Sequence, residues 1–187
     1  LDGFDRWPLY SDFFSTRLKR GGSSYNRLIE NLWEQTLQIV DELGRLIEAQ
    51  DIGLLFLINT HSNPGNVAMA LAVVLLSEMM GILVLNNCHD FYFEGGMSEK
   101  ERKASASSKG PRDHFFTNAH LGELFSVVQV LYPWNSPHWL TVTINQTQAD
   151  YLVQQLGHPP HRVMQICTAL DTTRFKKLDS RAQKQAL

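Results

Sequence analysis

The loop Asn86–Gly96, NNCHDFYFEGG, carries more reactive side chains than a structural turn requires. A turn needs Gly or Asn, but it does not need an imidazole with two carboxylates beside it. Here His89 precedes Asp90, and Glu94 and Gly95 follow a few residues later. Binding residues are concentrated on loops that a rigid scaffold positions. The loop therefore predicts a polar substrate site.

Each neighbour of His89 also has a structural interpretation. Asp90 could orient the imidazole or cap the following turn. The aromatic residues 91–93 could stack on a sugar ring or pack into the core. The pair Gly95-Gly96 could let backbone amides approach a ligand, or it could form a turn. These alternatives stay open at the level of sequence.

A second histidine, His61, follows the apolar segment 51–59 and precedes the sequence NPGN, Asn63–Asn66. This sequence predicts the beginning of a helix, whose N-terminus suits an anionic or hydroxyl-rich group. Ligands of open parallel sheets bind outside the carboxyl ends of the strands. If the two strands are neighbours, His61 and His89 would flank one crevice. Alternatively, His61 forms a hydrogen bond with a neighbouring loop.

Strands and helices alternate along the chain. Unbroken apolar runs predict buried strands, and apolar residues at helical spacing predict helices. The order predicts an α/β fold, a Rossmann-like parallel sheet with helices on both faces. The expected strands are 51–59, 82–85, 139–144 and 163–167, and the expected helices are 25–47, 67–80, 117–129 and 147–156.

Composition excludes several classes of protein. The net charge is −2, so the chain lacks the excess of positive charge expected of a protein that binds nucleic acid or an anionic membrane. The longest apolar stretch, Val67–Leu85, is interrupted by polar residues and by Gly81, so we expect no transmembrane segment. The two cysteines form no Cys-x-x-Cys pair, and no signal peptide is recognisable at the start, which favours a cytoplasmic protein.

Common catalytic motifs are also missing from the sequence. The seven histidines show no spacing typical of metal ligands, so no metal site is predicted. The chain contains neither a phosphate-binding P-loop nor the Gly-x-Ser-x-Gly sequence of a hydrolase.

The segment Trp139–Phe175 resembles the end of the N-terminal domain in retaining GT-B glycosyltransferases of family four. In that family a strand, a helix, a Gly and a Pro precede the pattern V-x-x-I-x-x-G-hydrophobic-D-x-x-x-F. Thr168-Ala169 stands where the family usually has Asn-Gly. The sequences THSN and ILVLNNCHDF are similar to two earlier strand ends of the same family. The residues that fit the first pattern are Val163, Ile166, Leu170, Asp171 and Phe175.

The resemblance implies half of a GT-B architecture. Residues 23–175 would form the acceptor-side domain, after an irregular segment 1–22 in which the family's first strand and glycine-rich loop are not recognisable. Residues 176–187 would lead to a C-terminal domain that binds the nucleotide-sugar donor. The chain would then be inactive by itself. Neither a cofactor nor a metal is implied, because the donor is a substrate and the family holds its diphosphate with basic side chains and a helix N-terminus.

By the same likeness His89 would be catalytic, forming a hydrogen bond with the transferred sugar or with the charge that develops on it. The partners would be the nucleotide-sugar donor and a sugar or small-molecule acceptor. The residues expected to bind substrate are His61, Asn63, Asn66, Asp90, Glu94 and Gly95.

Two other classes of function stay open. One is a non-catalytic α/β module that binds a carbohydrate or a partner. The other is a different GT-B enzyme, such as an epimerase or a phosphorylase. A donor-binding domain after residue 187 would favour the transferase, whereas an epimerase would consume a sugar nucleotide with no acceptor present.

Overall fold

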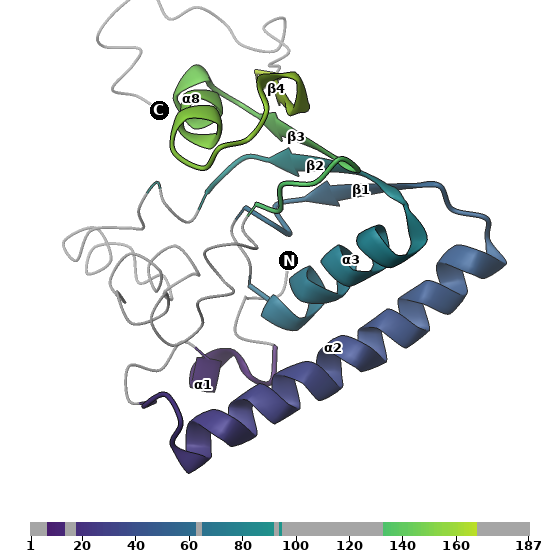
Figure 1. Cartoon of the computed structure of the whole chain (residues 1–187), viewed down its shortest axis with the longest axis vertical. Coiled ribbons are helices and arrows are strands. Elements are labelled where there is room, and N and C mark those ends of the chain that lie inside the picture. The colour runs from purple at the N-terminus through teal and green to yellow at the C-terminus, as the bar shows by residue number, and fades with distance from the viewer. Residues whose placement is uncertain (1–6, 14–17, 63–64, 92–93, 95–132, 168–187) are drawn as a thin grey trace, which may run out of the picture.

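The computed structural model describes residues 7–13, 18–62, 65–91, 94 and 133–167. At its centre is an all-parallel sheet of four strands in the order β1-β2-β3-β4 (Figure 1). The α/β class and the Rossmann-like parallel sheet predicted from the sequence are confirmed. The strands are β1 (Leu54–Ile58), β2 (Leu83–Cys88), β3 (Trp139–Thr143) and β4 (Val163–Gln165).

Helix α3 (Val67–Met80) lies between the sheet and the long helix α2 (Ser23–Ala49). Because α3 has neighbours on both sides, it is apolar almost all round, as expected of a buried helix. It ends at Gly81, whose φ of 67° is the left-handed conformation that glycine adopts without strain. In contrast, α2 is amphipathic and buries one stripe, formed by Leu28, Leu32, Thr36 and Ile47.

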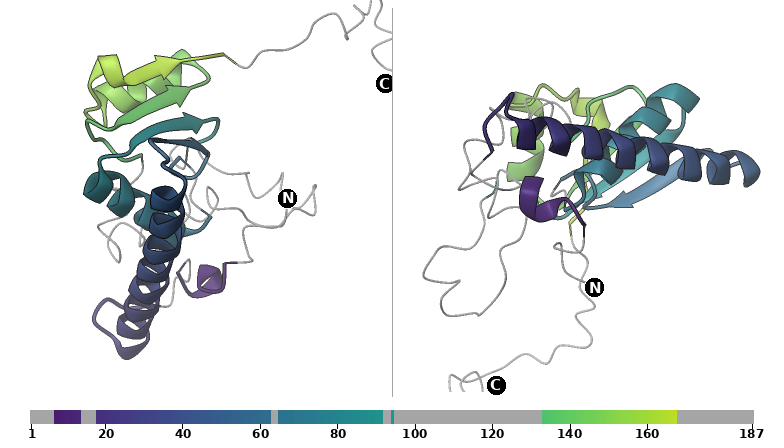
Figure 2. Two further views of the ribbon diagram at one scale, coloured as in Figure 1. Left: turned by 90° about the vertical axis from the view of Figure 1, so that its right-hand side faces the viewer. Right: turned by 90° about the horizontal axis from the view of Figure 1, so that it is seen from below.

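The helices of the βαβ units lie on one face of the sheet. On β2, Val84 and Cys88 are both buried, and alternation along a strand places them on the same face. Val84 packs in a cluster with residues of α3, and Cys88 packs against Leu152 of α8 (Gln146–Gln154). The described helices thus cover one of the two faces that were expected to carry helices, and Figure 2 shows this layering from the side.

The largest difference from the sequence prediction concerns β2. The strand was expected to end at Leu85, but it continues through Cys88. Its last residues stay in register with both neighbours, because Asn86 pairs with Leu57 of β1 and with Thr141 of β3. Paired backbone groups keep these polar residues in the sheet, so the loop proper begins at His89.

The N-terminal segment was expected to be irregular. Its described part contains a short helix, α1 (Tyr10–Phe13), and Phe13 is fully buried in the main apolar cluster. The indole Nε1 of Trp7 donates a hydrogen bond to Gln35 Oε1 of α2 at 2.8 Å. This segment therefore packs against the domain.

The remaining sequence predictions have different outcomes. The fourth strand is shorter than expected and follows a single 3-10 turn, η3 (Pro160–Arg162). The expected helix 117–129 and the domain boundary at residue 175 lie outside the described residues. No helix in the described ranges is long and apolar enough to cross a membrane.

Candidate functional site

Three loops meet at the carboxyl edge of the sheet, where open α/β proteins bind their ligands. They follow β1, β2 and β3, and side chains of Asn59 and Gln148 connect them through hydrogen bonds. The middle loop, which follows β2, begins with His89.

Asn59 holds the amino side of His89. Its Oδ1 accepts hydrogen bonds from the backbone N–H of His89 at 2.7 Å and from Ser62 Oγ at 3.2 Å. Asn59 has a φ of 55°, a left-handed conformation that asparagine tolerates better than most residues. Its own N–H donates to the carbonyl of Asn87 at 3.0 Å. The β1 loop is therefore fastened to the end of β2 at two points.

Gln148 holds the carbonyl side of the same residue. It is 2% exposed, and its Nε2 donates to the carbonyl oxygen of His89 at 3.0 Å and to Glu94 Oε1 at 2.9 Å. The other carboxylate oxygen of Glu94 accepts from the N–H of Phe91 at 2.7 Å. Gln148 Oε1 accepts a hydrogen bond from the N–H of Ile144 at 3.1 Å, so Gln148 connects the β3 loop to the β2 loop.

The imidazole of His89 is exposed, although its backbone is fixed on both sides. Its Nε2 lies 3.3 Å from Asn87 Nδ2, and the donor and acceptor roles in this contact depend on the tautomer of the ring. An exposed ring on a fixed backbone can offer Nδ1, the ring nitrogen that does not contact Asn87, to a polar ligand without prior movement of the chain.

His61 lies in a different environment from His89. It is fully buried, and its ring packs edge-on against Trp139, with 4.7 Å between the ring centroids. The indole Nε1 of Trp139 donates to Ser77 Oγ of α3 at 2.9 Å. The structure therefore encloses one predicted imidazole and exposes the other, and it does not bring them together at one open crevice.

The other predicted residues are placed as follows. Asn66 is the N-cap of α3, and its Oδ1 accepts from the N–H of Met69 at 3.0 Å, so the expected helix beginning is confirmed. Asp90 is half-buried, and Glu94 belongs to the hydrogen-bond network of Gln148. Asn63 and Gly95 lie outside the described residues.

Two buried polar groups lie behind this edge. Burial raises the pKa of the Cys88 thiol to about 12, although hydrogen bonding with Ser62 lowers it. The carboxamide of Asn86 is also buried and makes no hydrogen bond within the described part of the chain. In the same ranges, no three His, Cys, Asp or Glu side chains are arranged to hold a metal ion.

Sequence reasoning missed the two residues that organise the site. Asn59 was assigned to the end of a strand, and Gln148 was assigned to the first turn of a helix. The only local signal was Asn145 three residues before Gln148, because an Asn at that spacing is typical of an N-cap. The pattern predicts where α8 begins, but it does not predict that Gln148 reaches back to the β2 loop.

The comparisons with known proteins identify no relative. No protein family matches the chain, and neither a curated protein nor a solved structure shows significant similarity to it.

Proposed function

We propose that this chain is the acceptor-side domain of a retaining glycosyltransferase, which transfers a sugar from a nucleotide-sugar donor to an acceptor. One observation carries the proposal: His89 presents an exposed imidazole at the carboxyl edge of a parallel sheet, with its backbone polar groups held by the side chains of Asn59 and Gln148. The similarity of Trp139–Phe175 to family-four sequences supports the same assignment.

The anchoring of His89 fits the demands of sugar transfer. A positive charge develops on the transferred sugar in the transition state, and its hydroxyl groups need partners at fixed positions. Donors and acceptors that are already in place stabilise such a state better than mobile ones, because no ordering is needed when the reaction occurs. The proposed role of His89 is to form a hydrogen bond with the transferred sugar.

Glu94 has a supporting role in this proposal. Both carboxylate oxygens accept hydrogen bonds from the β2 loop and Gln148. Its described contacts therefore shape the loop around His89. We assign Glu94 to positioning, and we assign the contact with the sugar to His89.

The test uses the complete polypeptide in which this chain occurs. Release of nucleotide is measured with UDP-, GDP- and ADP-hexoses, with and without a panel of mono- and disaccharide acceptors. His89→Ala should lower acceptor-dependent release by about 100-fold or more, which is the order of magnitude of one lost transition-state hydrogen bond. The melting temperature should stay unchanged, because the two backbone anchors remain.

His161→Ala is the matched control. His161 is also exposed, but it lies in η3 at the amino edge of the sheet, away from the three loops. Its loss should leave turnover unchanged. Equal turnover in both variants would refute the role of His89, and turnover without any acceptor would indicate an epimerase.

A further inference from the structure

The second face of the sheet is apolar and exposed. Strand register places Leu54 beside Leu83 and Phe56 beside Leu85, so that their side chains share this face. No described helix covers it, and only Val142, at 3% exposed, is buried among its apolar residues. The exposed fractions are 55% for Leu54, 55% for Phe56, 58% for Ile58, 55% for Leu83 and 45% for Met164. We call these five residues the open face.

A groove of about 550 Å³ opens at the amino end of the open face. Leu54, Leu83, Leu85 and Leu140 line it together with Arg162 of η3. Its volume lies in the range of sites that receive a ligand or an anchoring side chain. No Asp or Glu is among its lining residues, so its local charge is positive.

An exposed surface of this kind is uncommon in a parallel sheet. All-parallel sheets almost always have both faces covered by helices, since the side chains on both faces are apolar. Contiguous apolar patches of several hundred Å² mark interaction surfaces. The open face is apolar like the strands of a covered parallel sheet, but no described helix lies on it.

The extent of the open face decides between two kinds of occupant. A small amphiphile would fill the groove, but it would leave Ile58 and Met164 exposed beyond it. A helix is long enough to cover both regions, because about 18 residues span roughly 27 Å and four strands span roughly 15 Å.

We propose that the open face binds an amphipathic helix of a protein partner. The apolar stripe of that helix enters the groove over Leu83, and its acidic flank faces the guanidinium of Arg162. Arg162 makes no ion pair within the described part of the chain, where the one ion pair joins Arg45 and Asp41. Its charge is thus available to select an acidic partner, and this inference does not depend on the transferase activity.

The test measures binding of two fluorescein-labelled peptides of about 18 residues to the complete protein by fluorescence anisotropy. Both peptides have the same leucine stripe, but one has Glu and the other has Lys on its polar flank. The acidic peptide should bind saturably and at least tenfold more tightly. Arg162→Glu should reverse this preference, because it reverses the charge at the groove.

Leu83→Asp should abolish binding of both peptides, whereas Leu46→Asp should leave it intact. The control is matched, because Leu46 is an equally exposed leucine of α2 outside the open face. Circular dichroism verifies that both variants are folded. If Leu83→Asp unfolds the protein, Leu54→Asp on the edge strand replaces it.

Several outcomes would overturn the proposal. They are the absence of saturable binding, equal affinity for both peptides, and binding that is insensitive to Arg162→Glu. Light scattering that shows a dimer lost in Leu83→Asp would assign the open face to a second copy of the chain. Stoichiometric displacement of the acidic peptide by dodecanoate would assign the groove to a small amphiphile.

Discussion

The anchoring role of Asn59 makes a prediction that can be tested without knowledge of any substrate. Asn59→Ala removes the oxygen that accepts from His89 N and Ser62 Oγ, and it places alanine at a φ of 55°. Asn59→Gly removes the same oxygen but relieves the backbone. Asn59→Asp retains an oxygen acceptor. The three variants therefore separate the hydrogen bonds from the backbone conformation.

The expected losses of unfolding free energy follow from these differences. Two partly exposed hydrogen bonds contribute about 1 kcal/mol each. The left-handed conformation costs alanine roughly 1 kcal/mol more than it costs glycine. We therefore expect a loss of about 3 kcal/mol for Asn59→Ala, about 2 kcal/mol for Asn59→Gly and less than about 1 kcal/mol for Asn59→Asp.

Urea unfolding of the complete protein, followed by circular dichroism, measures these losses. For a chain of this size the alanine variant should also melt roughly 6–12 °C lower. The order of stabilities is the decisive result. If Asn59→Asp is as unstable as Asn59→Ala, the oxygen does not anchor the loop, and the account of how His89 is positioned is wrong.

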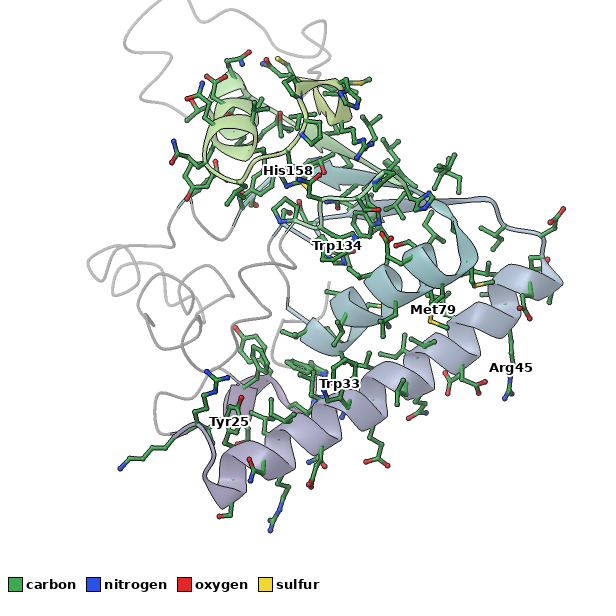
Figure 3. All side chains as sticks on the ribbon, in the orientation of Figure 1. Tyr25, Trp33, Arg45, Met79, Trp134 and His158 are labelled. Carbon is green, nitrogen blue, oxygen red and sulfur yellow. The ribbon has the colours of Figure 1, made fainter. Side chains whose placement is uncertain are left out.

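Two further predictions concern titratable groups. Iodoacetamide at pH 8 should modify exposed Cys167 quickly and Cys88 only after unfolding, because burial raises the pKa of the Cys88 thiol to about 12. Mass spectrometry before and after addition of urea measures this modification. Modification of both thiols in the folded protein would contradict the prediction. Burial lowers the pKa of His158 below its ordinary value of 6.5, and the side chain lies beneath α8 (Figure 3). A hydrogen bond with the Pro133 backbone raises the same pKa, but by less. The unfolded state therefore binds more protons than the folded state below pH 6.5. As the pH falls from 7.5 to 5.5, the free energy of unfolding should decrease more steeply in the unsubstituted protein than in His158→Asn. Urea titrations that give both proteins the same slope of unfolding free energy against pH would rule this out.

The sequence predicts the fold well where periodicity is strong. The bounds of α3 match the expected helix 67–80, because an apolar run with an Asn before it and a Gly after it leaves few alternatives. The predicted end of β2, Leu85, was wrong by three residues for a physical reason. Asn86 and Asn87 are typical of loops, but pairing with β1 and β3 on both sides keeps them in the sheet.

The open face could not be predicted from the same patterns. The apolar run of β1 indicates a strand buried on both faces, and its two sets of side chains are equally hydrophobic. The sequence shows which residues form each face of the sheet. Whether a face is buried depends on how distant parts of the chain, or a partner, pack against it. For this reason α2 and α3 could be predicted as helices, but not which face they occupy.

The two histidines illustrate the same limit at the site. Both follow a strand, and the sequence analysis placed both at the substrate site, with the catalytic role given to His89. Tertiary packing separates them, because His61 lies against Trp139 inside the core and His89 is held at the surface through its backbone. Truncation of His61 would leave a cavity and lower stability, so a loss of activity there could not be assigned to chemistry. Truncation of His89 leaves both backbone anchors in place, and a loss of activity there can be assigned to the imidazole itself.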